Sequence, residues 1–480
     1  MDLQNFLLPA YAINMGLLAV YGVHRLLMLK HFDWPAQADK KSDRPPTSAS
    51  DLPHVTVQLP IFNERTVVSQ LVQAAGALNY PAERLEIQIL DDSNDDTREL
   101  VDHEAAILVK QGIDCSVARR SNRDGFKAGA LDFGMRQAKG NLLCVFDADF
   151  IPAPEFLRDL VSNFEDPKVG MVQARWGHSN RDESLLTRAQ STLLDGHFVI
   201  EHKVRHDRGL FFNFNGTAGI WRRETIDSAG GWQHDTLTED LDLSYRAQLA
   251  GWKFVYAPTV VAPAEIPPTI SSFKSQQHRW AKGSVQVLRK LAWKILRSDE
   301  PLRVKIEAFT HLTGNIGYPC VLFLALLLPL SLGLHEQVPQ WLQFSLFLLC
   351  SLSVVLFYER SQRALGRPLG ARLRDIFAAV TLGIGMCVSQ TRAVFSGCRS
   401  STGSFVRTPK RGDASRPKSN YTVSLKGLPG IELLLATWFA WAIVNAAMDS
   451  LWGSIPFLLL FFVSFAWVGS LSLRDWARGT

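Results

Sequence analysis

Long apolar stretches on either side of a charged middle are the feature that most constrains how this 480-residue chain can fold. Each stretch is about as long as a helix must be to cross the hydrocarbon core of a bilayer. The stretches are residues 6–29, 309–334, 341–358, 431–448 and 455–473. We therefore expect about five membrane-spanning helices, one before the charged middle and four after it.

Basic residues indicate on which side of the membrane the middle lies. Lysines and arginines follow the first apolar stretch between residues 25 and 44, so the positive-inside rule predicts a cytoplasmic middle. Residues 376–395 are also apolar, but basic residues flank both of their ends. We expect this stretch to lie in the membrane interface instead of crossing the bilayer.

Composition and the missing motifs exclude several common functions. The formal net charge is only +5, which does not indicate a nucleic-acid-binding protein. The six cysteines are scattered without CxxC pairs or metal-ligand spacing, which predicts reduced cysteines with a packing role. No predicted strand is followed by GxGxxG or a P-loop, so the usual dinucleotide and P-loop chemistries are not indicated.

The charged middle alternates predicted strands with predicted helices. Strands are expected at residues 55–59, 85–90, 113–118, 142–146 and 169–174. Helices are expected at residues 65–78, 154–164 and 183–202, and another should open within residues 124–131. This spacing indicates a mostly parallel sheet covered by helices on both faces, which is an α/β fold.

Residues 142–150, LLCVFDADF, place two carboxylates directly after a buried strand. Asp147 and Asp149 should lie at the sheet edge where α/β folds bind ligands, and alternation points both to the same side. Two close acids need a cation, and oxygen ligands suit Mg²⁺ or Mn²⁺ shared with substrate phosphates. The same pair would also suit a turn or a helix cap.

Other polar or aromatic side chains are expected at the same edge of the sheet. Phe62 follows the first strand, where its ring could stack on a nucleobase or simply belong to the core. Asp91 and Asp92 follow the second strand, where they could accept hydrogen bonds from a base or ribose or form a turn. Lys127 begins a helix, where the helix dipole disfavours a cation and a phosphate partner would compensate. A solvated lysine is the ordinary alternative.

The sequence TEDLDL, residues 238–243, has a structural and a functional interpretation. Thr238 suits a helix N-cap, and acids suit the first turn. The functional interpretation makes Asp240 the general base of an inverting sugar transfer, a role typically worth about 10²–10⁴-fold in rate. The diphosphate leaving group would need no acid, because a metal and cationic donors would stabilise it.

Two further stretches carry groups suited to a ligand. Residues 211–221, FFNFNGTAGIW, form a glycine-bearing turn that could approach a ligand closely or be a β-bulge. QQHRW, residues 276–280, lies on an amphipathic segment at residues 271–296. Arg279 offers a fork to phosphate, and Trp280 offers a flat face to a sugar. The same segment would suit a membrane-surface helix anchored by Trp and Arg.

The order of these motifs resembles that of processive inverting glycosyltransferases of family 2, which include cellulose, chitin and hyaluronan synthases. The runs that read almost as in plant cellulose-synthase-like mannan and glucan synthases are LDDSNDDT, GFKAGAL, FDADF, VQARW, FNGTAG, EDLDL and QQHRW. The resemblance covers about residues 53–288 closely and the membrane layout more loosely. It implies a GT-A-type nucleotide-binding sheet combined with a helical transmembrane region.

The resemblance also implies a role for each matching residue. Those that would bind the nucleotide sugar are Phe62, Glu64, Asp91, Asp92, Lys127, Asp147, Gln276 and Arg279. Asp149, with Asp147, would hold Mg²⁺ or Mn²⁺, and Asp240, with Glu239 beside it, would carry the catalysis. Those at the acceptor end would be Trp280, Gly216 and Thr217. Residues 405–410, FVRTPK, resemble the gating loop FxVTxK with the valine-to-threonine spacing changed by one position, and Thr408 and Lys410 would contact phosphate there.

These features predict five parts of the chain. They are an N-terminal transmembrane helix (1–30), a linker (31–52), a cytoplasmic GT-A domain (53–270), an interfacial QxxRW segment (271–300) and a C-terminal transmembrane region (301–480). The last part would contain the interfacial helix 376–395 and the gating-like loop 399–427. The expected location is the inner membrane of a bacterium or the Golgi membrane of a eukaryote.

The expected reaction is hexose transfer, with inversion, from a nucleotide sugar to a growing β-1,4-linked glucan or mannan, coupled to its translocation. The alternative is a single-addition enzyme that glycosylates a lipid. QQHRW favours the polymer, because Arg279 and Trp280 would hold a chain between additions. The mannan-synthase-like motifs favour GDP-mannose, while the wider family favours UDP-glucose, which is the weak preference here. Membrane lipids and accessory export subunits are the other expected partners, and nucleic acid is not one.

Overall fold

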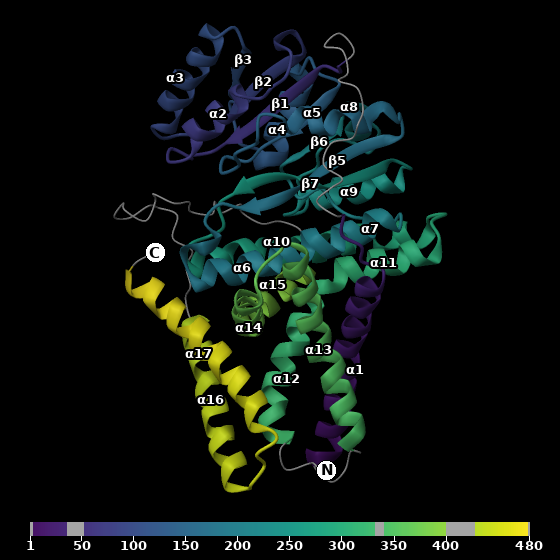
Figure 1. Ribbon diagram of the computed structural model, residues 1–480, viewed down its shortest axis with the longest axis vertical. Coiled ribbons are helices and arrows are strands. Elements are labelled where there is room, and N and C mark those ends of the chain that lie inside the picture. The colour runs from purple at the N-terminus through teal and green to yellow at the C-terminus, as the bar shows by residue number, and fades with distance from the viewer. Residues whose placement is uncertain (1–2, 36–51, 332–339, 400–427, 479–480) are drawn as a thin grey trace.

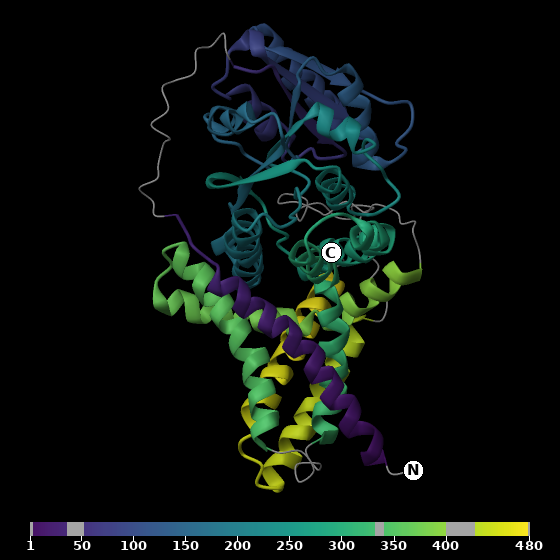
Figure 2. The same cartoon turned by 90° about the vertical axis from the view of Figure 1, so that its right-hand side faces the viewer.

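The computed structural model describes residues 3–35, 52–331, 340–399 and 428–478. Most of the expected linker and nearly all of the gating-like loop, with Thr408 and Lys410, lie outside these ranges. Figure 1 shows a sheet covered by helices at one end of the molecule and a set of long helices at the other, and Figure 2 shows the same two parts from the side. Helices α6 and α10 lie between these two parts (Figure 1).

The sheet has seven strands in the order β3-β2-β1-β4-β6-β5-β7. They are β1 (Val55–Ile61), β2 (Leu85–Asp91), β3 (Asp114–Ala118), β4 (Leu142–Val145), β5 (Val169–His178), β6 (Gly219–Arg222) and β7 (Lys253–Ala264). Neighbouring strands are parallel except for β6, which is antiparallel to both β4 and β5. The prediction of a mostly parallel sheet is confirmed, although it did not include β6 or β7.

Helices cover the sheet on both faces. They are α2 (Val68–Gly76), α3 (Thr97–Lys110), α4 (Phe126–Gln137), α5 (Phe156–Val161), α8 (Arg223–Ser228) and α9 (Glu239–Leu249). Short 3₁₀ turns lie at Ala82–Arg84, Ser162–Glu165, Arg181–Glu183 and Gly314–Ile316. The single helix expected at residues 183–202 is wrong in detail, because α6 (Leu185–Asp195), a π-helix (Gly196–His202) and α7 (Lys203–Asp207) follow one another there.

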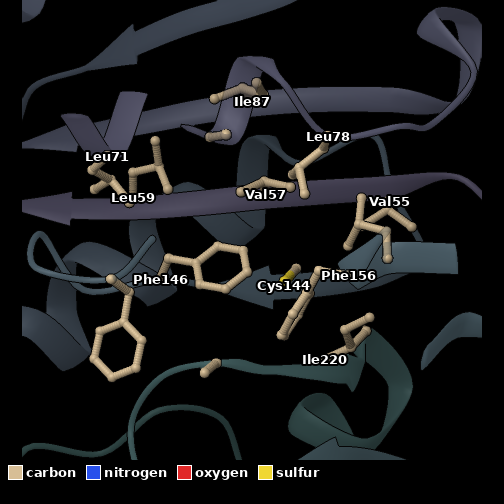
Figure 3. Packing of buried hydrophobic residues seen from close by; sticks show 14 of the residues in the cluster. Val55, Val57, Leu59, Leu71, Leu78, Ile87, Cys144, Phe146, Phe156 and Ile220 are labelled. Carbon is tan, nitrogen blue, oxygen red and sulfur yellow. The ribbon is translucent and has the colours of Figure 1, made fainter. Parts of the chain in front are cut away.

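The core of this part forms where the apolar strands face α2 and α5. Val57 of β1 pairs with Ile87 of β2 on one side and with Cys144 of β4 on the other. Figure 3 shows the rings of Phe146 and Phe156 lying together below β1, with their centroids 4.9 Å apart. This burial fixes β4 in the middle of the sheet, and with it the acids that follow. All six cysteines are free, as predicted.

The remaining helices lie beyond the sheet and the helices that cover it. They are α1 (Leu3–Lys30), α10 (Ile270–Arg297), α11 (Leu302–Thr313), α12 (Gly317–Ser331), α13 (Gln340–Ala364), α14 (Leu369–Gly385), α15 (Cys387–Arg399), α16 (Leu428–Met448) and α17 (Ile455–Arg478). Within the described residues, four stretches are long and apolar enough to cross a membrane, namely 9–30, 302–330, 430–448 and 455–478. Helix α13 covers the fifth expected span but is not among these four. Helix α1 packs on α13 so closely that a Cβ at Gly22 would lie 2.9 Å from the Leu349 carbonyl oxygen.

The apolar stretch at residues 376–395 forms two helices instead of one. Helix α14 ends at Gly385, and α15 begins at Cys387. A Cβ at Gly385 would overlap Cγ2 of Val468, so this end of α14 packs directly against α17. Figure 1 shows α14 end-on while α12, α13, α16 and α17 run vertically, so α14 lies across the direction of the long helices.

Candidate active site

A pocket lies at the sheet edge where β1 and β4 end and where α9 and α10 face the sheet; we call it the outer pocket. Most of the residues expected at the site line it, namely Phe62, Glu64, Asp92, Lys127, Asp147, Asp149, Gly216, Glu239, Asp240, Gln276, Arg279 and Trp280. The structure thus brings together side chains from segments that are more than 200 residues apart in sequence. Asp91 and Thr217 do not line the pocket.

The two adjacent acids after β2 have different surroundings. The Asp91 side chain is fully buried, accepts a hydrogen bond from the Ser93 backbone N–H at 3.0 Å and forms an ion pair with Arg119 at 2.8 Å. Asp92 lines the outer pocket and accepts a 3.0 Å hydrogen bond from Nε of Arg120. Of the two acids expected to bind the nucleotide, only Asp92 is therefore placed to do so, while Asp91 fixes the loop.

Phe62 carries an unexpected partner. The guanidinium carbon of Arg123 lies 3.2 Å from the centroid of the Phe62 ring, and both side chains line the outer pocket. Arg123 was not among the residues expected at the site, although the basic run RRSNRD just before α4 is a signal that could have identified it. A planar cation on an aromatic ring makes a flat wall of the kind on which a nucleobase stacks.

Lys127 connects α4 to the acid after β4 and to the glycine turn. Its Nζ pairs with Asp147 and donates to the Gly216 carbonyl oxygen at 2.7 Å. Burial alone lowers the pKa of Lys127, but attraction to nearby carboxylates, Asp147 foremost, outweighs burial and raises the pKa above its ordinary value. Lys127 is therefore a cation at working pH, as a phosphate-binding lysine must be.

Thr217 supports the site from behind. Its side chain is buried, and its hydroxyl oxygen accepts a 2.9 Å hydrogen bond from the backbone N–H of Asp147. This bond ties the turn that follows β4 to the glycine turn that precedes β6. Thr217 is thus positioned to hold Asp147 in place, and the expected contact with an acceptor has no support in its geometry.

Glu239 and Asp240 open α9, as expected for acids in a first turn. Asp240 accepts a 2.8 Å hydrogen bond from the backbone N–H of Leu241. Burial, together with repulsion from Glu239, raises the pKa of Asp240 to about 7. A carboxylate with this pKa is a much better proton acceptor than an ordinary aspartate.

The expected side-chain cap at Thr238 is not present. Thr238 occupies the N-cap position, but its side chain makes no capping hydrogen bond. Helix α10 packs against this threonine, since a Cβ at Gly283 would lie 2.5 Å from the Thr238 hydroxyl oxygen. Tertiary packing has therefore overridden the local preference of threonine for capping.

Helix α10 carries Gln276, Arg279 and Trp280 into the outer pocket. Burial lowers the pKa of Arg279 to about 10, which still leaves the side chain charged near neutral pH. The Trp280 ring lies 6.4 Å from the ring of Trp176, at an angle of 57°. The two indoles form one aromatic corner of the pocket, of the kind that packs on sugar rings.

A second cavity, which we call the inner cavity, continues from the outer pocket towards the long apolar helices. The residues that line both spaces include Trp176, Asn215, Thr238, Asp240 and Trp280. The far wall of the inner cavity includes Tyr21, His24 and Arg25 of α1, His311 of α11, Tyr318 of α12 and Tyr358 of α13. These residues were not expected at the site, because aromatic and polar side chains in an apolar helix also suit helix packing.

The outer pocket has the donors that a shared metal needs. Asp147 and Asp149 both line it, and Asp147 is paired with Lys127. Among the described residues, no group of three or more His, Cys, Asp or Glu side chains could hold a metal by itself. Two carboxylates fit Mg²⁺ or Mn²⁺ only when substrate oxygens complete the coordination, which is the arrangement expected from the sequence.

Comparison with known proteins gives a family model and similar relatives. A family model described as glycosyltransferase-like family 2 matches residues 53–283. Glucomannan 4-beta-mannosyltransferase 2 of Arabidopsis thaliana is 41% identical over 304 residues, which are 61% of this chain and 57% of that protein. Probable glucomannan 4-beta-mannosyltransferase 10 of the same plant is 36% identical over 380 residues, which are 76% of this chain and 67% of that protein. The chain thus spans little more than half of the first of these relatives.

Among solved structures, the mannosyltransferase PcManGT from Pyrobaculum calidifontis, in complex with GDP-Man and Mn2+, has a TM-score of 0.53 and 19% sequence identity. The match covers 82% of this chain and 98% of that chain. At this identity the likeness shows a shared fold, and it confirms the expected GT-A-type α/β architecture.

Proposed function

Because this chain belongs to glycosyltransferase family 2, we propose that it transfers mannose from GDP-mannose, with inversion, onto the end of a β-1,4-linked glycan. The weak preference for UDP-glucose is replaced, since the plant relatives are glucomannan 4-beta-mannosyltransferases. The alignment covers 57% of the first relative, so the proposed reaction is argued from the residues of this chain's own site.

The observation that carries the proposal is the position of Asp240 between the outer pocket and the inner cavity, both of which it lines. A nucleotide sugar along the outer pocket and an acceptor glycan in the inner cavity would meet at this carboxylate. Such a meeting point is what transfer from one to the other needs.

Asp240 acts as the general base in this mechanism. Its carboxylate takes the proton from the acceptor hydroxyl while that oxygen attacks the anomeric carbon of the donor from the side opposite the diphosphate. The bond between the sugar and the diphosphate breaks as the new bond forms, so an α-linked donor gives a β-linked product. The raised pKa of Asp240, about 7, suits a base that works near neutral pH.

The positive side chains stabilise the leaving diphosphate. Lys127 and Arg279 both line the outer pocket, and each can donate to phosphate oxygens as negative charge develops there. Mg²⁺ or Mn²⁺, held by Asp149 and Asp147 together with diphosphate oxygens, would supply further charge neutralisation. Phe62, with Arg123 on its ring, provides the flat wall for the base.

The inner cavity supports extension of a polymer. Its wall combines side chains of α1, α11, α12 and α13 with aromatic rings, and a glycan leaving Asp240 would enter the space between these helices. The proposal therefore includes a multi-pass membrane protein with a cytoplasmic sheet domain, whose product moves into the membrane region as it grows. Lipid and accessory subunits would complete the route.

Purified protein in lipid nanodiscs, incubated separately with radiolabelled GDP-mannose and UDP-glucose, tests the proposal. We expect label from GDP-mannose in an ethanol-insoluble product that an endo-β-1,4-mannanase degrades. Label only in a chloroform-soluble product would contradict polymer synthesis and support the single-addition alternative. Label from UDP-glucose alone, in a product that a β-1,4-glucanase degrades, would contradict the mannosyl donor.

A further inference from the structure

A buried set of hydrogen bonds reaches from the first long helix towards the catalytic domain. His24 of α1 lies 2.8 Å from one carboxylate oxygen of Glu307 on α11, through its Nε2. The other oxygen of Glu307 accepts from Nε of Arg205, on α7, at 2.9 Å. Only 2% of the Arg205 side chain is exposed. An arginine of the catalytic domain is therefore bound to both long helices through one carboxylate.

The set continues along the π-helix. Nη1 of Arg205 donates to Glu201 at 3.2 Å, and Nδ1 of His197 lies 2.9 Å from the same Glu201 oxygen. His197 and Glu201 both belong to the π-helix at Gly196–His202. Single π-helical turns are uncommon and often occur at functional sites, and here the four-residue spacing brings all three side chains into one row.

Asn215 is the last residue of this row. Both the nitrogen and the oxygen of its side-chain amide have a partner, which fixes the orientation of the amide. Its Nδ2 donates to Nε2 of His197 at 3.0 Å, and its Oδ1 lies 2.7 Å from Nε2 of His202. Nδ1 of His202 is buried without a hydrogen-bond partner among the described residues. His202 is therefore neutral with its proton on Nε2, and burial, with neighbouring His197 and Arg205, holds its pKa well below the ordinary value.

It follows that His197 accepts at Nε2 and carries its proton on Nδ1, which donates to Glu201. Every donor in the row then faces an acceptor: Arg205 and His197 donate to Glu201, and Asn215 donates to His197. A row satisfied in this way holds Asn215 in one orientation. The Asn215 backbone N–H also donates to Oε1 of Gln173 at 3.0 Å.

The residue after Asn215 is Gly216, which contacts the two groups on which the chemistry depends. Its carbonyl oxygen accepts from Lys127 at 2.7 Å. A Cβ on this glycine would lie 3.0 Å from Oδ2 of Asp240. A shift of Asn215 would therefore move the Lys127 partner and open space beside Asp240.

We propose that Arg205 and Asn215 are positioning residues for sugar transfer, linked through Glu201 and His197, so that the packing of α1 and α11 sets the position of Lys127 and Asp240. That these residues affect sugar transfer rests on the proposed function, whereas the link between them does not depend on it. Neither residue donates or accepts a proton in the reaction. Asn215 lines both pockets and Arg205 lines the inner cavity, but the non-additive part of their effect acts through the Gly216 turn.

The charges of the row favour this role over simple stabilisation. A buried ion pair is usually no more stabilising than apolar side chains of the same size. What the pair provides is a fixed geometry, since an arginine held by two carboxylates cannot move without breaking one of its contacts. The row of hydrogen bonds that carries this geometry reaches Asn215, next to Gly216.

Double-mutant cycles test the linkage. We expect Arg205→Met and Asn215→Ala each to lower kcat by about 10- to 100-fold, and the double variant to be no slower than the slower single variant. Arg205→Lys, which keeps a cation between Glu201 and Glu307, should recover part of the rate. The matched control is Arg181→Met, which removes another buried arginine bound to a long helix, at 2.5 Å from Asp375 on α14. The fold-losses of kcat caused by Arg181→Met and by Asn215→Ala should multiply in the double variant.

If the fold-losses of kcat caused by Arg205→Met and Asn215→Ala multiply in a folded, active double variant, the linkage is overturned. His197→Ala, tested in the same cycle, gives the answer if Arg205→Met does not fold. Equilibrium binding of GDP provides a readout without turnover, in which the same variants should weaken binding non-additively through Lys127. Failure of the wild type to transfer any sugar would count against the proposed function alone, while additive losses in GDP binding would count against the linkage alone.

Discussion

A Cβ atom at Gly216 would lie 3.0 Å from Oδ2 of Asp240 and 3.5 Å from Nζ of Lys127, and the glycine has a φ of +80°. We expect Gly216→Ala to displace both groups and to lower kcat by about 10- to 100-fold. Alanine at positive φ also costs about 1–2 kcal/mol of stability. Gly209→Ala is the matched control, because Gly209 has a φ of +59° with nothing within 4 Å of its Cβ position. Equal activity of the two variants would contradict the close contact.

Removing the carboxylate charge of Asp240 should abolish most of the transfer. We expect Asp240→Asn to lower kcat by about 10²–10⁴-fold with little change in the KM for the donor, since asparagine cannot take the acceptor proton. Asp235→Asn serves as the control, because Asp235 is an exposed acid three residues before Thr238 that pairs with Lys290 at 2.7 Å. Steady-state rates with GDP-mannose measure both, and an active Asp240→Asn variant would remove Asp240 as the base.

The rate should depend on pH through Asp240. Its pKa of about 7 means that the carboxyl is largely protonated, and so inactive as a base, at pH 6. We therefore expect kcat to rise as pH increases through about 7 and then to level off. Glu239→Gln removes one of the causes that raise this pKa, so the inflection should move to lower pH.

Glu224→Gln, on the exposed side of α8, should leave the inflection of the pH–rate profile where it is. A profile that is flat between pH 5 and pH 8 would contradict a general base with this pKa. An inflection that stays in place in Glu239→Gln would show instead that Glu239 does not contribute to the raised pKa of Asp240.

Chelation should stop the reaction, because the two carboxylates cannot neutralise the diphosphate without a cation. We expect EDTA to abolish transfer and added Mn²⁺ to restore it. Asp149→Asn should raise the Mn²⁺ concentration needed for half-maximal rate. Asp132→Asn, which removes a half-buried acid of α4 that pairs with Arg136, should leave this concentration unchanged. Full activity in EDTA would exclude the metal.

A buried ion pair fastens α10 to the last hairpin. Nζ of Lys274 lies 2.5 Å from Oε1 of Glu432, and both side chains are almost completely buried. We expect Lys274→Met to destabilise the protein by about 3–5 kcal/mol, because it leaves a buried carboxylate without its partner. Thermal melting in detergent should show a large loss, and Lys274→Met/Glu432→Met should recover much of it.

Lys139→Met provides the exposed counterpart, since Lys139 and Asp114 form a surface pair with 58% and 43% of their side chains exposed. Its loss should change stability by no more than about 1 kcal/mol. Similar melting shifts in Lys139→Met and Lys274→Met would mean that the Lys274 pair is worth no more than a surface contact.

Sequence patterns predicted the parts of the fold that depend on neighbouring residues. The apolar run at residues 142–146 became β4 because a strand covered on both faces must be apolar throughout, and the acids that follow it reached the outer pocket. The acids of TED opened α9 because the helix dipole favours them there. Most of the candidate site followed from these local rules and from the resemblance.

The missing features depend on contacts between distant parts of the chain. Strand β6 has only four residues, and no periodicity in so short a segment shows that it will enter the sheet antiparallel between β4 and β5. The partner of Lys127 at Gly216 is 89 residues away, and that of Arg205 at Glu307 is 102 residues away. Thr238 was expected to cap α9 until packing against Gly283 of α10 overrode that preference.

The partners that hold α10 are synthesised long after it. Glu432 comes 158 residues after Lys274, and Asp475, which accepts a 2.9 Å hydrogen bond from the Ser271 hydroxyl, comes 204 residues after that serine. On the ribosome the sheet domain can therefore be complete while the helix that bears Arg279 and Trp280 still lacks these two contacts. We expect full sugar transfer only when α16 and α17 have been made, so a chain that lacks them should consume little donor.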